Sequence, residues 1–283
     1  MKKSINTLVA AALAASMVMS MTGCSGKTAE SSASESSEVS CAASTAESVA
    51  ASEGSTAAPT ISGADEEKGE GVMTYAEYSA AELDSQVTVE TYIQAKQGWW
   101  ENEGVGVATF YTQDADGAYF LYNMPCSEDE YALLTEGTKI KVTGYKSEWS
   151  GEIEITDATY EIEDGNYIAE PVDVTDLLAS DDLINSQNML VSFTGMTVEA
   201  ADDSGAAFLY NYDGSGSEGD DLYFKVSYNG QTYTFTVESY LTGSDSDVYK
   251  AVKALKVGQK VDMEGFLYWY EGVNPHIISV TAE

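Results

Sequence analysis

The alternation of apolar and polar positions divides the chain into three regions. Residues 5–21 are mostly apolar and carry no charge, and residues 25–71 are rich in Ser, Ala, Glu, Thr and Gly. The remaining residues form short runs in which apolar and polar side chains alternate, separated by Gly, Asn, Asp and Ser. Alternation with a period of two is typical of half-buried β-strands, and the separating residues are typical of turns. The third region therefore predicts a mainly β fold with short helices.

The first half of this region predicts five strands and two capped helices. The strands are expected at residues 87–93, 105–112, 118–124, 138–147 and 152–160. A Ser or Thr followed three residues later by Glu forms a capping box, which predicts short helices beginning after Thr74 and Ser127. Residues 96–104 are expected to form a loop between the first two strands, and Asp114 to Gly117 a hairpin turn.

The second half repeats this plan. Strands are expected at residues 190–198, 222–228, 231–238, 260–269 and 276–281, with a short helix at 175–183. The polar segment 244–247 is expected to cap a second helix, whose apolar face is formed by Val248, Ala251, Val252 and Leu255. Residues 202–221 form the main insertion relative to the first half.

A direct repeat supports this division. Leu134–Gly151 aligns without a gap with Leu255–Gly272. The alignment places Gly144 on Gly265, Tyr145 on Phe266 and Trp149 on Tyr270. A repeat of this kind predicts two copies of one small domain. The paired glycines lie in the middle of a strand, where a small barrel needs a bend.

The order of three strands, a helix and two strands in each copy is that of the OB-fold, a five-stranded Greek-key barrel. The G-x-K-[IV]-x-[VM]-x-G-[YF] segment resembles the fourth strand of bacterial OB domains, and Trp149 to Ile153 resembles the turn into the fifth. The chain as a whole resembles tandem OB-fold lipoproteins of Gram-positive bacteria. This resemblance implies two tandem OB-fold-like domains, at residues 73–165 and 166–283, and brings no catalytic motif.

The N-terminus resembles a bacterial lipoprotein signal. Lys2 and Lys3 precede the apolar stretch, which ends in Met21-Thr22-Gly23-Cys24. The resemblance implies that residues 1–23 are a signal peptide and that Cys24 carries the lipid, so that the protein is anchored to the outer face of the cell membrane. A plain secretory signal with an incidental cysteine is the alternative. Residues 24–72 are expected to be a disordered linker, because they have too few large apolar residues to form a core.

Charge narrows the range of partners. The chain has 13 Lys plus Arg, all of them lysine, against 47 Asp plus Glu, for a formal net charge of −34. A surface this acidic repels phosphate, and without arginine the chain lacks the usual bidentate reader of phosphate and guanine. Nucleic acid and anionic membrane surfaces are therefore disfavoured as direct partners.

Aromatic residues are the best candidates for a ligand surface. Trp99 and Trp100 lie in the loop between the first two strands, while Trp149 and Trp269 lie at the turn between the fourth and fifth. In OB-folds these loops frame the ligand surface, and the aromatic rings can stack on sugars or apolar side chains. With Tyr145, these residues are the predicted ligand-binding set. The alternative is that the rings close the barrel ends or pack the domains together.

Other chemistry is less well supported. Asn211, Asp213 and Ser215 carry the alternating oxygens of the first half of a calcium loop, but Leu222 stands where its bidentate Glu is needed. A solvated hairpin tip explains the segment better. Cys41 and Cys126 suggest neither a disulfide framework nor a zinc site. His276 has no partner in a motif, and no nucleophile, phosphate-loop or dinucleotide pattern is present. We therefore expect a protein without enzymatic activity or a cofactor.

Together these observations predict a membrane-anchored extracellular binding module for a neutral glycan or a protein partner. Two alternatives stay open. One is a structural subunit of a cell-surface complex that binds no small ligand. The other is single-stranded nucleic-acid binding, which rests on analogy with other OB-folds alone.

Overall fold

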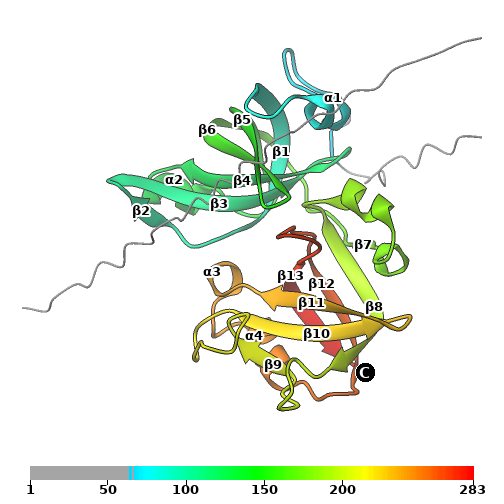
Figure 1. Ribbon diagram of the computed structural model, residues 1–283. Helices are drawn as coiled ribbons and strands as arrows, with labels where there is room; N and C mark the ends of the chain where they lie inside the picture. Colours follow the sequence, from blue (N-terminus) through cyan, green and yellow to red (C-terminus); the bar gives the residue numbers. More distant parts are fainter. Residues whose placement is uncertain (1–63, 66) are drawn as a thin grey trace, which may run out of the picture. The chain divides into compact units, whose positions relative to one another are not determined.

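The computed structural model describes residues 64, 65 and 67–283, which Figure 1 draws in colour. The described residues belong to one compact unit. The predicted signal peptide at 1–23, the lipidation site Cys24, Cys41 and most of the predicted linker lie outside the described residues. Within the described part of the chain, no helix is both long enough and apolar enough to cross a membrane.

The first barrel is built from five main strands. They are β1 (Gln86–Lys96), β3 (Val105–Gln113), β4 (Ala118–Pro125), β5 (Thr138–Trp149) and β6 (Glu152–Asn166). Their order is β1-β5-β6-β4-β3, and β3 pairs back with β1, which closes the sheet. Strands β4 and β6 are parallel, and the other pairs are antiparallel. This is the strand order of an OB-fold barrel.

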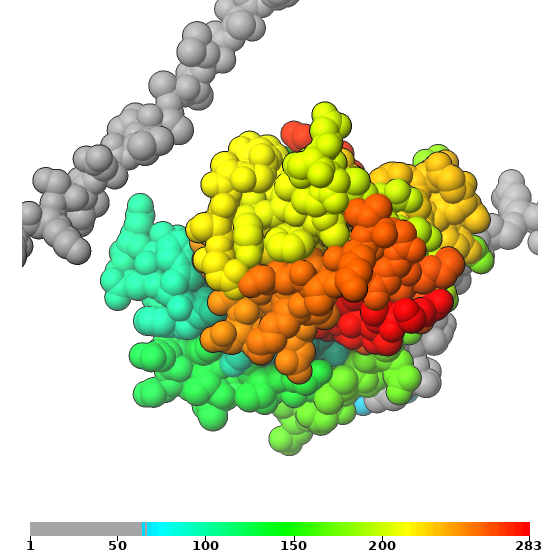
Figure 2. All heavy atoms as spheres, turned by 90° about the horizontal axis from the view of Figure 1, so that it is seen from below, coloured from blue at the N-terminus to red at the C-terminus, as the bar shows by residue number. Residues whose placement is uncertain are grey.

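The second barrel has the same topology, strand for strand. Its strands are β8 (Leu190–Glu199), β10 (Leu222–Tyr228), β11 (Gln231–Val237), β12 (Lys260–Phe266) and β13 (His276–Ala282). They follow the order β8-β12-β13-β11-β10, with β10 pairing back to β8, and β11 and β13 are parallel. The predicted fold class of two tandem OB-like barrels is thus confirmed. Residues of this barrel, yellow to red, cover the centre of the face seen in Figure 2.

Capping determines where the helices begin. Helices α1 (Tyr75–Ala80) and α2 (Glu128–Leu133) each show both hydrogen bonds of the predicted capping box. Helix α4 (Asp247–Lys253) begins after Ser246, whose hydroxyl accepts from the Tyr249 N–H. The sequence does not predict a further one-turn helix, α3 (Ser239–Thr242), whose N-cap residue Glu238 makes no capping hydrogen bond through its side chain.

Two predicted segments differ from the structure. The helix expected at 175–183 is instead two 3₁₀ segments, η1 (Thr175–Leu177) and η2 (Asp181–Ser186). The Ser180 hydroxyl accepts from the Asp182 N–H and so caps η2. A new helical segment therefore begins after Ser180, because Ser side chains compete with the backbone for helical hydrogen bonds. The loop expected at 96–104 contains a short strand, β2 (Trp100–Asn102), which pairs with the start of β3.

Two shorter strands complete the second sheet. Strand β7 (Val172–Asp173) pairs in parallel with β8, and β9 (Phe208–Tyr210), within the insertion, pairs with β10. Strand β12 ends at Phe266, earlier than predicted, because the chain leaves the ladder before Trp269 pairs in an isolated bridge with Val273.

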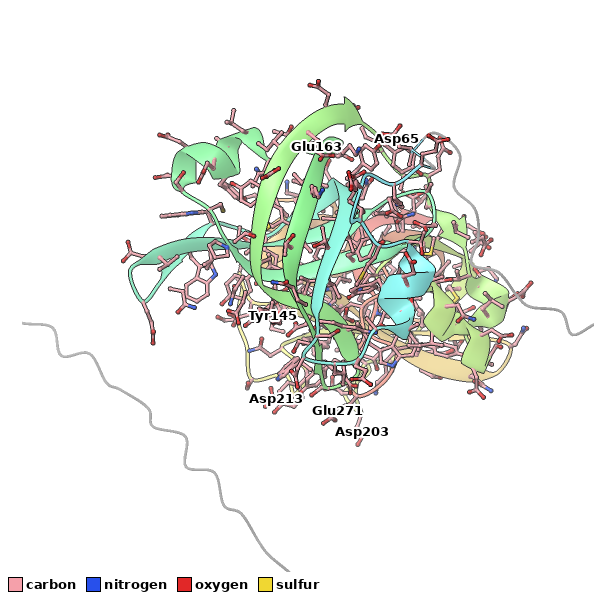
Figure 3. The ribbon with its side chains drawn as sticks, turned by 90° about the horizontal axis from the view of Figure 1, so that it is seen from above. Asp65, Tyr145, Glu163, Asp203, Asp213 and Glu271 are labelled. Atoms are coloured by element: carbon pink, nitrogen blue, oxygen red, sulfur yellow. The ribbon has the colours of Figure 1, made fainter. Side chains whose placement is uncertain are left out.

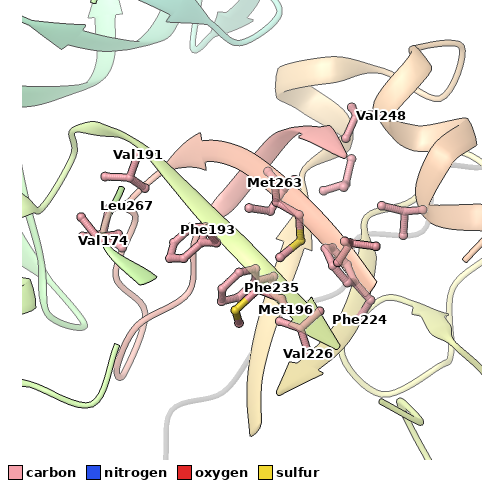
Figure 4. Packing of buried hydrophobic residues seen from close by; sticks show 14 of the residues in the cluster. Val174, Val191, Phe193, Met196, Phe224, Val226, Phe235, Val248, Met263 and Leu267 are labelled. Carbon is pink, nitrogen blue, oxygen red and sulfur yellow. The ribbon is translucent and has the colours of Figure 1, made fainter. Parts of the chain in front are cut away.

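Each barrel encloses its own apolar core. Figure 4 shows the core of the second barrel, in which Phe193 of β8 and Phe235 of β11 pack with ring centroids 4.6 Å apart. Met263 of β12 belongs to the same buried cluster. In the first barrel, Phe110 and Ile140 are fully buried. Burial of these apolar surfaces is the main term that stabilises both barrels.

The last residues of the predicted linker contact the first barrel. Lys68 Nζ lies 2.6 Å from Asp114 Oδ2, and Lys139 Nζ lies 3.4 Å from Asp65 Oδ2. Lys139 also lies 3.2 Å from Glu163 Oε2, and Figure 3 labels Asp65 and Glu163 at the same edge of the molecule. These residues therefore pack against the folded region predicted at 73–165, because Lys68 pairs with the buried carboxylate of Asp114 and Asp65 pairs with Lys139 of the barrel.

Gly144 and Gly265 provide the expected bends. The register of β5 with β6 shifts across Gly144, and that of β12 with β13 shifts at Gly265. A Cβ at Gly144 would lie 2.8 Å from the Thr156 carbonyl oxygen, and one at Gly265 would lie 2.8 Å from Ile277 Cα. In each barrel, the glycine thus allows the fourth strand to approach the backbone of the fifth at a bulge.

Candidate functional site

The two copies of the repeat meet at their equivalent turns. Ser150 and Gly151 join β5 to β6 with φ of 54° and 95°, and Glu271 and Gly272 have φ of 53° and 141°. The Glu271 N–H donates to the Ser150 carbonyl oxygen over 2.7 Å. Each turn carries a glycine where the backbone needs a positive φ, so both copies turn through two consecutive residues with positive φ.

An aromatic pair lies directly before these turns. The rings of Trp149 and Tyr270, which occupy equivalent positions in the repeat, have centroids 5.2 Å apart and planes tilted by 36°. Trp149 is nevertheless 54% exposed and Tyr270 45% exposed. The pair therefore presents a broad apolar surface to solvent, formed by one ring from each barrel.

Beside Trp149 lies a cavity of about 300 Å³, here called the aromatic pocket. Its apolar lining comes from Phe120 and Tyr122 of β4, Trp149 of β5 and Tyr268, which follows β12. Phe120 and Tyr268 meet edge to face, with centroids 5.4 Å apart. Two carboxylates, Glu154 and Glu238, lie in the same lining. Both barrels therefore contribute to this one pocket.

A hydrogen-bonded group forms one wall of the pocket. The Nδ1 atom of His276, the one histidine of the chain, lies 2.6 Å from the Tyr111 hydroxyl and 3.2 Å from Glu238 Oε2. Gln97 Nε2 donates to both oxygens of Glu238 over 2.9 Å, and the Tyr268 ring stacks on the imidazole with centroids 4.2 Å apart. Glu238 is therefore already satisfied by protein partners, and His276 is held by its neighbours.

Glu154 differs from Glu238 in its hydrogen-bond partners. Its side chain is only 7% exposed, yet within the described residues its carboxylate has neither a hydrogen-bond partner nor an ion pair. Burial raises the pKa of Glu154 to about 7. The pocket thus holds a carboxylate that can still accept hydrogen bonds from a ligand.

The predicted site residues lie at different places in the structure, and only Trp149 lines the aromatic pocket. Trp149 lines the aromatic pocket, and Trp269 lies next to the paired turns, where its backbone N–H donates to Glu152 Oε2 over 2.9 Å. The Trp269 ring is half-buried against the core of the second barrel. Tyr145 is exposed on β5, where Figure 3 labels it, but it does not line the pocket.

Trp99 and Trp100 differ in exposure and lie away from the aromatic pocket. Trp99 is half-buried against the first core, and its Nε1 donates to the Cys126 carbonyl oxygen over 3.0 Å. Gly106 lies under its ring, because a Cβ there would come within 2.5 Å of Trp99. Trp100 is 47% exposed on β2, and neither residue lines the aromatic pocket. Cys126 itself is a buried free thiol.

Of the residues that line the pocket, the sequence predicted only Trp149. The other seven are Gln97, Phe120, Tyr122, Glu154, Glu238, Tyr268 and His276. The alternation on β4 does place Phe120 and Tyr122 on one face, and that on β6 places Glu152 and Glu154 on one face. Carboxylates are so numerous in this chain that nothing in the sequence distinguished Glu154 from the solvent-exposed ones.

The predicted calcium segment forms a local turn. Asp213 Oδ1 accepts from the Ser215 N–H over 3.0 Å, and Asn211 adopts a φ of 58°. Across residues 64, 65 and 67–283, no group of three or more His, Cys, Asp and Glu is arranged to hold a metal ion. Asp213 thus uses one carboxylate oxygen within its own turn.

No family model and no curated protein matches the chain. Among solved structures, it is similar to the Ifi202 HINa domain in complex with 20 bp double-stranded DNA, with 13% identity over 71% of this chain and 97% of that one and a TM-score of 0.31. It is also similar to a replication protein A heterotrimer bound to single-stranded DNA, with 12% identity, coverage of 72% and 51%, and a TM-score of 0.31. A single-stranded DNA binding protein from Thermus aquaticus is similar at 12% identity, with coverage of 70% and 93% and a TM-score of 0.24. Both barrels have the strand order of the OB-fold.

Proposed function

We propose that this protein is a non-catalytic binding module that recognises its ligand at the aromatic pocket and the adjoining Trp149–Tyr270 pair. The exposure of that pair carries the proposal. Trp149 and Tyr270 remain 54% and 45% exposed although both barrels position them. Exposed rings that the fold holds in place are typical of a surface that a ligand covers, because large aromatic side chains dominate interface energies.

The ligand that best fits this surface is a neutral glycan or a protein partner. Aromatic planes stack on sugar rings and on apolar side chains, and Glu154 can accept hydrogen bonds from hydroxyl or N–H groups. The net charge of −34 and the absence of arginine disfavour ligands with a phosphate chain. The DNA-bound structures named above do not alter this choice, because a likeness at such low TM-scores carries no argument about the ligand.

Truncating Trp149 tests this site. We expect Trp149→Ala to weaken binding by about tenfold or more, because about 1.4 kcal/mol of stacking energy corresponds to one factor of ten. The full chain would be screened against immobilised neutral glycans and surface proteins, and the affinity of any binder would be measured by calorimetry.

Trp100→Ala is the matched control. Trp100 is 47% exposed, close to the value for Trp149, but it lies on β2 outside the pocket. Unchanged affinity in Trp149→Ala would place the site elsewhere. A stable complex with a surface protein that tolerates both substitutions would favour the structural-subunit alternative.

We further propose that Cys24 anchors the module to the outer face of the cell membrane. This proposal is supported by the resemblance of residues 1–24 to a lipoprotein signal. In a bacterial host, Cys24→Ser is expected to shift the protein from the membrane fraction to the medium and to abolish labelling by a radioactive fatty acid. Membrane retention of the variant with unchanged label would contradict a lipid at this residue.

A further inference from the structure

The aromatic pocket combines two features that attract positive charge. Phe120, Tyr122, Trp149 and Tyr268 line it, and the faces of aromatic rings carry negative electrostatic potential. Glu154 adds a carboxylate that is 7% exposed and has no protein partner within residues 64, 65 and 67–283. No lysine is among the residues that line this pocket. No cationic side chain of the lining therefore balances the negative charge and potential of the pocket.

We propose that the aromatic pocket binds an organic ammonium group, with the rings packed around the cation and Glu154 as its counter-ion. The inference rests on the proposed function, because it names the chemical group that the same site takes up. A volume of about 300 Å³ suits a small head group rather than a whole polymer. The group can belong to a free amine or to the lysine side chain of a partner protein.

Glu154, rather than Glu238, is the counter-ion. Gln97 donates to both oxygens of Glu238, and His276 Nδ1 lies 3.2 Å from one of them. Glu238 is therefore occupied by protein donors, whereas Glu154 is only 7% exposed and has no donor among the described residues. A bound cation restores the interaction that burial removed, which makes ion pairing at Glu154 worth more than at an exposed carboxylate.

Binding is also expected to depend on pH. Burial raises the pKa of Glu154 to about 7, so a cation binds better once this carboxyl is ionised. Affinity should therefore increase between about pH 6 and pH 8. The titratable groups around Glu154 are Glu152 on its own strand, Tyr122 on β4, and Glu238, Tyr268 and His276 from the second barrel.

Calorimetry on the full chain tests the inference with defined probes. These are choline, Nα-acetyl-lysine amide, and 3,3-dimethyl-1-butanol, the uncharged carbon isostere of choline. We expect at least one cation to bind tenfold or more tightly than the isostere. Choline and the lysine derivative distinguish a quaternary head group from a lysine side chain as the source.

Single substitutions test whether the cation binds in the aromatic pocket. Glu154→Gln keeps the shape of the side chain and is expected to weaken cation binding tenfold or more and to remove its pH dependence. Trp149→Ala should weaken it similarly, and Trp100→Ala should leave it unchanged. Thermal unfolding of each variant shows whether it is folded.

Equal affinity for choline, the lysine derivative and the isostere would overturn the inference, as would cation binding that Glu154→Gln leaves intact. If a neutral glycan or protein binds through Trp149 without any preference for cations, the inference fails while the proposed function stands. If no ligand of any class depends on Trp149, the proposed function fails as well.

Discussion

Replacing Gly265 with alanine is expected to lower the free energy of unfolding of this protein by about 3 kcal/mol, the upper part of the range for overpacked sites. The added Cβ would lie 2.8 Å from Ile277 Cα and 2.9 Å from the His276 carbonyl carbon. Both contacts are with backbone, which cannot move aside as a flexible side chain can. Relief therefore requires β12 and β13 to separate where their register already shifts.

Urea unfolding of the full chain, followed by far-UV circular dichroism, measures this effect. Gly98→Ala is the matched control, because nothing lies within 4 Å of the Cβ that it adds. That variant is expected to stay within about 0.5 kcal/mol of the parent. Gly144→Ala should resemble Gly265→Ala, since its Cβ would meet the Thr156 carbonyl oxygen at 2.8 Å. If Gly265→Ala and Gly98→Ala had equal stability, the close-approach explanation would be wrong.

The equivalence of Gly144 and Gly265 shows why much of the fold could be predicted. Three signals define the barrels: period-two alternation, capping boxes at Thr74 and Ser127, and a repeat that aligns without gaps. The first two depend on residues a few positions apart, and the repeat follows from aligning the chain with itself, so all three can be interpreted without knowing the tertiary structure. The strand order followed from the number and sequence of these elements.

The site depends on contacts that no local pattern encodes. Trp149 was predicted because it lies at a turn, but its neighbour Tyr270 is 121 positions away in the repeat, and the turns meet only because the barrels pack together. The partnership of His276 with Tyr111 joins strands of different barrels. The partial burial of Trp99 has the same origin, since the Cys126 carbonyl oxygen that its indole N–H reaches lies three strands further along the chain.

Glu152 shows how this packing creates a group whose charge matters for stability. Its side chain is fully buried, and Oε2 accepts from the Trp269 N–H at 2.9 Å and from Gln187 Nε2 at 3.2 Å. Oε1 has no partner among the described residues, and neither has Asn188 Oδ1. Asn188 keeps this orientation because its Nδ2 donates to the Ile153 carbonyl oxygen. A proton would turn Glu152 Oε1 from an unpartnered acceptor into a donor, and the neighbouring Asn188 side chain carries an unpartnered acceptor, Oδ1.

The protonation of Glu152 links stability to pH. Burial raises its pKa from 4.5 to about 8, so between these values the folded chain holds a proton that the unfolded chain releases. Stability attributable to this group therefore falls as pH rises from about 4.5 to about 8 and is constant outside that window. At about 1.4 kcal/mol for each pKa unit, the loss over this difference of about 3.5 units amounts to at most about 5 kcal/mol.

Glu152→Gln is accordingly expected to stabilise the protein at pH 8 by about 2–4 kcal/mol and to leave it nearly unchanged at pH 4.5. The amide oxygen can still accept from Trp269 and Gln187, while the amide nitrogen can donate to Asn188. Urea unfolding of the full chain between pH 4.5 and 8.5 measures the difference. Glu148→Gln, on the exposed end of the same hairpin, should follow the parent at every pH. A Glu152→Gln variant that is less stable than the parent at pH 8 would show that Glu152 is ionised in the folded protein and contributes as a charged acceptor.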